Sequence, residues 1–135
     1  MPTHPVTNVV AWFEIPVTNM DRAAKFYETI LNISIDIVTV NQGRVGHLVS
    51  DNSIGGVSDN GIGGALVENM QLGYQPADVG SLVYLAGGED LSEVLDRVED
   101  AGGKVLLAKT PLGEYGFAAL FRDTEGNKVG LRSAS

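Results

Sequence analysis

The stretch WFEIPVTNMDRAAKFYETIL, residues 12–31, changes from a strand pattern to a helix pattern within a few residues. Aromatic and β-branched residues before Thr18 are typical of a strand, which we predict over 9–17. Thr18 is the predicted helix N-cap, and Asp21 three residues later forms a weak capping box. Apolar residues then recur at helical spacing. The helix face predicted to be buried consists of Met20, Ala23, Ala24, Tyr27, Ile30 and Leu31.

Glu14 is a carboxylate in the middle of this apolar strand. Strand alternation places Trp12, Glu14 and Pro16 on one face. A buried carboxylate without a partner is costly, so Glu14 points to water, finds a partner or belongs to a site. The strand therefore contains one candidate functional residue, and its surroundings decide its role.

The same order of elements occurs twice along the chain. After the first helix we predict strands at 33–40, 44–50 and 65–67. In the second half we predict a strand at 81–86 and a helix at 90–101 that is capped by Asp90. Three further strands are predicted at 105–107, 117–121 and 128–132. The chain is thus predicted to be α+β, with module one at about 8–68 and module two at about 80–133 as βαβββ units. Neither module can bury its sheet well alone, so we expect them to share a core.

Composition narrows the class of protein. The 135 residues are 44% hydrophobic and 19% charged, which suits a folded domain, and the net charge is −8. A nucleic-acid partner is not expected, because no cluster of Lys or Arg is evident. The absence of cysteine excludes disulfides and thiolate metal sites. No signal peptide or membrane-spanning run is evident, so we expect a cytoplasmic protein with no membrane partner.

Three stretches carry a resemblance to a known family. They are WFEIPVTNMDRAAKFYETIL, EDLSEVLDRVEDAGGKV and KTPLGEYGFAALFRDTEGNKVGLRS. Together they resemble the vicinal-oxygen-chelate superfamily of glyoxalase I, bleomycin-resistance proteins and extradiol dioxygenases, in particular its glyoxalase-like bacterial group. The resemblance implies one glyoxalase-like domain over 1–135. It also implies an eight-stranded, cup-shaped pair of sheets with helices outside, a small-molecule cavity and a homodimer.

Catalytic members of the superfamily hold a divalent metal with His, Glu or Gln at four strand positions. Carried onto this sequence, those positions are Trp12, a residue near Ala65, Leu82 and Gly130. None of these side chains offers the oxygen or imidazole ligands that such a metal needs. We therefore expect no metal at the family's site and no cofactor.

Glu14 is the candidate catalytic residue in the cup that the resemblance implies. The first and last ligand strands converge in this fold, so we expect Glu14 to meet Arg132 or Lys128. With a cation nearby the carboxylate stays ionised; without one, burial raises its pKa and suits it to acid or base chemistry. Three roles remain open: a structural ion pair, a ligand contact or a catalytic acid/base.

Trp12 and Arg132 are ligand-binding candidates together with Glu14, and further candidates lie on other elements. His47 alternates with valines in a predicted strand. The same pattern fits a histidine of the core or the surface that has no functional role. Tyr115 and Phe117 are candidates for an aromatic wall at the cup mouth, with Lys109 as its polar anchor. The simpler alternative is that Phe117 belongs to the core face of its strand. The glycine-rich loop Gly55–Gly64 is either a flap over the cup or an ordinary connection.

These features support three hypotheses. The first is a protein that binds a small molecule in the cup without a metal, as drug-sequestering resistance proteins do. The second is a lyase, isomerase or dioxygenase-type enzyme of the same superfamily, with a glyoxalase-like lyase the expected form; it uses Glu14 without a metal, or metal ligands at other positions. The third is an interaction module whose cup is filled by side chains such as Trp12 and Leu82.

Overall fold

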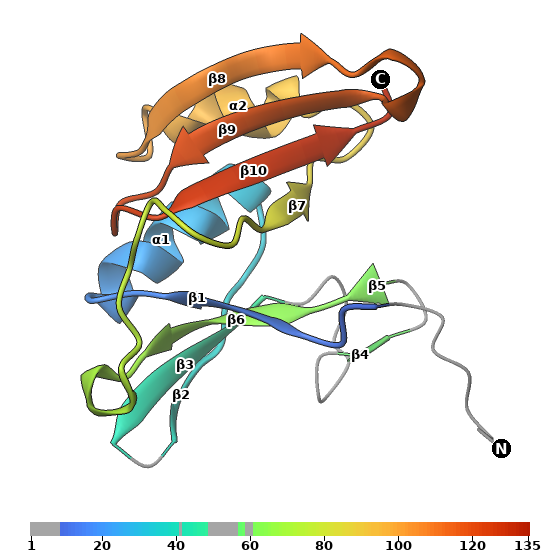
Figure 1. Cartoon of the computed structure of the whole chain (residues 1–135). Helices are drawn as coiled ribbons and strands as arrows, with labels where there is room; N and C mark the ends of the chain where they lie inside the picture. The colour runs from blue at the N-terminus through green and yellow to red at the C-terminus, as the bar shows by residue number, and fades with distance from the viewer. Residues whose placement is uncertain (1–8, 41, 49–56, 59–60) are drawn as a thin grey trace, which may run out of the picture.

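The computed structural model describes residues 9–40, 42–48, 57–58 and 61–135 (Figure 1). The first module contains β1 (Phe13–Pro16), α1 (Met20–Leu31), β2 (Ile37–Val40), β3 (Gly43–Leu48) and β6 (Gly64–Glu68). The second contains β7 (Tyr84–Ala86), α2 (Ser92–Val98), β8 (Lys104–Pro111), β9 (Phe117–Arg122) and β10 (Lys128–Ser133). Shorter elements are the hairpin β4 (Val57–Ser58) and β5 (Gly61–Ile62), and the 3₁₀ turns Met70–Leu72 and Gly113–Tyr115.

Each module forms one four-stranded sheet, in the orders β1-β6-β3-β2 and β7-β10-β9-β8. In both sheets the first strand of the module runs parallel to the last, and the remaining pairs are antiparallel. The predicted α+β fold of two βαβββ modules is confirmed. Residues 55–56 and 59–60 of the predicted loop Gly55–Gly64 lie outside the described residues, and its described part includes the β4–β5 hairpin.

Helix α1 begins one residue later than predicted. The Asn19 side chain, not that of Thr18, accepts the capping hydrogen bond from the Arg22 backbone N–H at 3.0 Å. The Thr18 hydroxyl is instead directed to the Glu125 carboxylate, 3.0 Å away. At its other end the helix stops at Asn32, whose left-handed conformation (φ 55°) turns the chain toward β2.

Both sheets and both helices share one hydrophobic core. Phe26 and Tyr27 of α1 lie against Phe121 of β9, with ring centroids 5.9 and 6.5 Å apart, while α1 also contacts β3 and β6. Helix α2 packs against α1, β8 and β9. Since alternate residues of a strand face opposite ways, the other face of each sheet points away from this core. Within the described residues, neither helix has the length and apolar character needed to cross a membrane.

A polar cluster in the β9–β10 turn joins the second module to the first by hydrogen bonds. The buried Asp123 accepts a 2.7 Å hydrogen bond from the Tyr27 hydroxyl. Asn127, also buried, donates to the Pro16 carbonyl at 2.8 Å and to Asp123 at 3.0 Å. Glu125 accepts hydrogen bonds from the N-terminal end of α1. We call Asp123, Glu125 and Asn127 the turn clamp, because it fixes how β1 and α1 sit against β10.

Candidate functional site

We call the two sheet faces that point away from the core the first and second open faces. On the first, Glu14 of β1, Ala65 of β6 and His47 of β3 stand side by side in the strand register. Ile15 and Leu66 alternate with this row and are buried in the core. Because Glu14 alternates with the buried Ile15, it lies on the sheet face opposite the helices. Strand alternation in the sequence predicts the same face.

Glu14 accepts hydrogen bonds from two aromatic residues. The Tyr74 hydroxyl donates to one carboxylate oxygen, and Trp12 Nε1 donates to the other at 3.4 Å. The hydrogen bond to Glu14 raises the pKa of the Tyr74 hydroxyl, so Tyr74 remains a proton donor at neutral pH. The Trp12 ring also lies beside the His47 ring, with centroids 6.2 Å apart.

The structure thus brings three predicted site residues, Trp12, Glu14 and His47, together with Tyr74. Tyr74 was missed because it lies between the modules, just after the 3₁₀ turn Met70–Leu72, where no strand or helix period predicts a direction. A tyrosine in a linker is an ordinary surface residue by sequence alone. Only the path of the linker beside β1 shows that its hydroxyl reaches Glu14.

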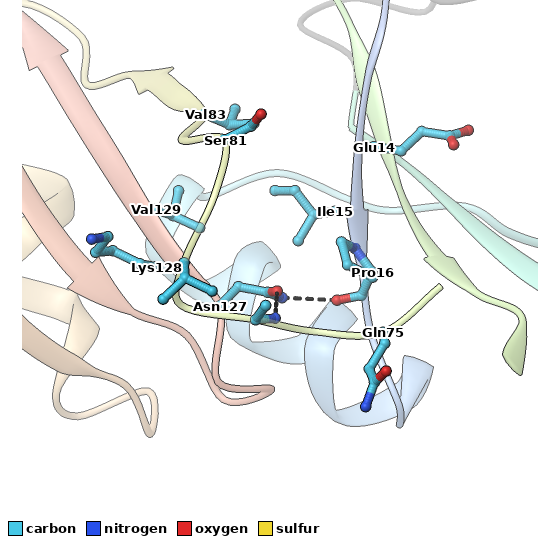
Figure 2. A pocket seen from close by; sticks show the side chains of 11 residues that line it. Glu14, Ile15, Pro16, Gln75, Ser81, Val83, Asn127, Lys128 and Val129 are labelled. Carbon is cyan, nitrogen blue, oxygen red and sulfur yellow. Dashed lines mark hydrogen bonds between the residues drawn. The ribbon is translucent and has the colours of Figure 1, made fainter. Parts of the chain in front are cut away.

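The expected pairing of Glu14 with Arg132 or Lys128 is wrong. Figure 2 shows the Glu14 and Lys128 side chains pointing to opposite sides of the space between β1 and β10. Arg132 instead lies over the Tyr84 ring, 5.7 Å from its centroid, and donates to the Tyr115 carbonyl at 2.9 Å. The reason is the shared core: the two sheets turn their open faces away from it, so residues on those faces diverge.

The remaining predicted ligand contacts lie in the second module. Lys109 forms a 2.9 Å ion pair with Asp90 and stands 4.5 Å from the centroid of the Phe117 ring. Phe117 packs against the core, which agrees with the simpler of its two interpretations. Tyr115 is 71% exposed. Among the described contacts, none joins these residues to Glu14, so they do not form one site with it inside a single chain.

A groove of about 250 Å³ lies where the modules meet (Figure 2). Its lining is mainly apolar, with Ile15 and Pro16 on one side and Val83 and Val129 on the other. Its polar lining residues are Glu14 of β1, Gln75 and Ser81 of the linker, Asn127 of the turn clamp and Lys128 of β10. A second groove of about 250 Å³ is lined by Phe13, Leu31, Ile33, Leu48, Ile62, Tyr84, Leu85 and Ala86. Both are slightly smaller than the roughly 300–1,000 Å³ of typical drug-sized sites.

The family model of the Glyoxalase/Bleomycin resistance protein/Dioxygenase superfamily matches residues 9–131. The chain belongs to this superfamily. A comparison with curated proteins finds no match.

Solved structures of the superfamily share the fold. A glyoxylase/bleomycin resistance protein/dioxygenase domain from Frankia sp. EAN1pec matches with a TM-score of 0.68 and 17% identity, covering 96% of this chain and 100% of that one. A glyoxalase/bleomycin resistance protein from Albidiferax ferrireducens T118 matches with a TM-score of 0.60 and 18% identity, covering 95% and 100%. A glyoxalase I mutant from Zea mays has a TM-score of 0.65 and 22% identity over 92% of this chain and 46% of that chain. This chain therefore spans less than half of the maize protein.

The four positions at which the resemblance places the superfamily's metal ligands are Trp12, a residue near Ala65, Leu82 and Gly130, and none of these side chains has an oxygen or imidazole ligand. Ala65 is fully buried, and the Tyr84 ring covers Gly130 so closely that even an added Cβ at Gly130 would overlap with it. The indole N–H of Trp12, its one polar group, donates a hydrogen bond to Glu14. Among the described residues, no three His, Asp or Glu side chains gather closely enough to hold a metal ion.

Proposed function

We propose that this protein binds a small organic molecule on the first open face, with the Glu14–Tyr74 pair as its polar centre and without the superfamily's metal. The observation that carries the proposal is the position of Glu14. Its exposed carboxylate is held by Tyr74 and Trp12 beside His47, on a sheet face that neither helix covers. A few convergent polar groups beside aromatic rings are typical of small-molecule sites.

The experiment is a thermal-shift screen against metabolites, repeated with Glu14→Gln and Tyr74→Phe. We expect a stabilising ligand to lose at least tenfold in affinity in Glu14→Gln, because the amide cannot accept the same charge-assisted hydrogen bonds. Glu114→Gln is the matched control, since Glu114 is also exposed and lies on the Gly113–Tyr115 turn of the other module. Unchanged ligand affinity in Glu14→Gln would contradict the proposal.

A second candidate function is a metal-independent lyase or isomerase. It is favoured by the chemistry of the pair: an accessible carboxylate that can take a proton and a protonated tyrosine beside it that can donate a hydrogen bond. Turnover of a ligand found in the screen, lost in Glu14→Gln while binding survives, would select the enzyme. Binding without turnover would select the ligand-sequestering protein.

We also propose a homodimer. Both open faces expose apolar side chains, with Val38 41% exposed on the first and Tyr84 45% exposed on the second. Pairing the first open face of one copy with the second open face of another would cover both and would enclose Glu14 in a cup. Light scattering of the purified protein tests this, and a monomer at micromolar concentration would contradict it.

A further inference from the structure

The linker between the two modules runs along the groove where the modules meet (Figure 2). Every second residue of the linker lines this groove, which is the alternation of an extended chain. The lining residues of the linker are Gln75, Ala77, Val79, Ser81 and Val83. Ile15 of β1 and Val129 of β10 line other sides of the groove. The linker is thus one wall of the groove.

Two glycines lie at the ends of the first half of this wall. Gly73 and Gly80 have φ angles of 83° and 90°, in the left-handed region that glycine adopts without strain. Apart from chain neighbours, no atom lies within 4 Å of the position that a Cβ would take at either glycine. Glycines in open space can absorb a change in backbone direction, as hinge residues do. We call residues 74–79, which lie between these two glycines, the strap.

Few contacts hold the strap in place. Four of its six residues are exposed, and none of them is among the described residues that form the hydrophobic core. The Tyr74 hydroxyl donates to Glu14, and the Ala77 N–H donates to the amide oxygen of the turn clamp at 3.1 Å. Asp78 forms a weak ion pair with Arg122 at 3.5 Å. A segment that is held by a few polar contacts at the surface opens locally at a low cost in free energy.

We propose that the strap is a gate, and that a planar cationic ligand opens it by taking Glu14 from Tyr74. Both carboxylate oxygens of Glu14 already accept hydrogen bonds, one from Tyr74 and one from Trp12. An amidinium or guanidinium group donates through two parallel N–H groups, so it is favoured over one neutral hydroxyl. Without its contact to Glu14 the strap turns outward about its two glycines, and the apolar sides of the groove become accessible. This gate rests on the proposed function at Glu14 and adds the class of the ligand and its effect on the groove.

The first test measures hydrogen exchange of single backbone amides in ¹⁵N-labelled protein without ligand. Tyr74→Phe removes the hydroxyl that holds the strap and keeps the ring. We expect the Ala77 amide to exchange about fivefold faster in this variant, the effect of one ordinary hydrogen bond. The Gly130 amide donates to the Val83 carbonyl at 2.9 Å, beyond the strap, and should exchange at the wild-type rate. Tyr115→Phe, at an exposed tyrosine of the second module, is the matched control and should change neither amide.

Two results of this exchange experiment would overturn the gate. An unchanged rate at Ala77 in Tyr74→Phe would show that Tyr74 does not hold the strap closed. Equal acceleration at Ala77 and Gly130 would show that the whole junction between the modules loosens and that no hinged segment moves by itself. Neither result depends on a ligand, so the proposed function at Glu14 is tested separately.

The second test adds benzamidine, a planar cation, and benzamide as its neutral counterpart. The indole N–H of Trp12, which donates to Glu14, reports whether the carboxylate is occupied. We expect benzamidine to shift this indole signal and to accelerate exchange at Ala77 in the wild type but no further in Tyr74→Phe, whereas benzamide should do neither. A shifted indole signal with unchanged exchange at Ala77 would overturn the gate and leave the site at Glu14 standing. No indole shift at millimolar benzamidine would contradict the site itself and, with it, control of the strap by a ligand.

Discussion

Glu125→Gln provides the sharpest test of how the two modules are joined. The Glu125 side chain is fully inaccessible to solvent, although it lies in a turn. One carboxylate oxygen accepts from the backbone N–H groups of Thr18 and Asn19, both at 2.9 Å. The other accepts from Arg22 Nε at 2.7 Å. A residue of the second module thus supplies the negative charge at the N-terminus of α1, where the helix dipole favours it.

The size of the stability loss expected for Glu125→Gln follows from the pKa of the Glu125 carboxyl group. Burial alone would raise it, but the hydrogen bonds from Arg22, Asn19 and Thr18 outweigh burial and lower the pKa of Glu125 from 4.5 to about 2. A shift of this size corresponds to about 3 kcal/mol at neutral pH. The Arg22 side chain is 51% exposed, so water weakens the contribution of its ion pair with Glu125 to stability. We expect Glu125→Gln to lower the free energy of unfolding by about 2 kcal/mol, or the melting temperature by about 7 °C.

Urea unfolding at pH 7 and at pH 3 measures this effect. Because the folded-state pKa of Glu125 lies below its unfolded-state value, its stabilisation is complete above about pH 5 and is lost as the pH falls toward 2. The difference between wild type and Glu125→Gln should therefore shrink at pH 3. Glu114→Gln, at an exposed turn, is the control. If Glu125→Gln unfolds at the same urea concentration as the control at pH 7, Glu125 does not stabilise the contact between the two modules.

Three further predictions follow from the same structure. Tyr27→Phe leaves Asp123 without its 2.7 Å hydrogen bond in a buried site and should cost about 1–3 kcal/mol by urea unfolding; a loss below 0.5 kcal/mol would be contrary to expectation. Lys109→Met removes the principal cause of the lowered pKa of Asp90, about 2, so an NMR titration should find the pKa of that carboxyl higher than in wild type. Metal analysis of protein purified without chelators should find no stoichiometric divalent ion, and EDTA should leave the melting temperature unchanged; a bound ion would refute the metal-free proposal.

Much of the fold is predictable from the sequence because it depends on local periodicity. The apolar spacing from Met20 to Ile30 predicts α1, and the face predicted from it is buried apart from the partly exposed Leu31. The N-cap was misplaced by one residue because Thr18 and Asn19 are both good caps. Glu125, 107 residues after Thr18 in the chain, decides between them by accepting a hydrogen bond from the Thr18 hydroxyl.

The candidate site was predictable only in part. Strand alternation placed Trp12 and Glu14 on one face, and the register of β3 then brought His47 beside them. The partner of Glu14 was mispredicted, because convergence of the first and last strands does not determine which way their open faces turn. Tyr74, the residue that holds Glu14, lies in a linker with no periodic pattern.

By itself the sequence determined the two βαβββ modules, the superfamily and the absence of ligand-type side chains at its four metal places, since each depends on residue type and spacing along the chain. The tertiary structure alone decided that the open faces diverge, that Tyr74 rather than Arg132 meets Glu14, and that the linker forms one wall of the groove between the modules. These relations join segments that are distant in sequence. They depend on sheet register and on which surfaces the shared core buries, and no local pattern encodes either.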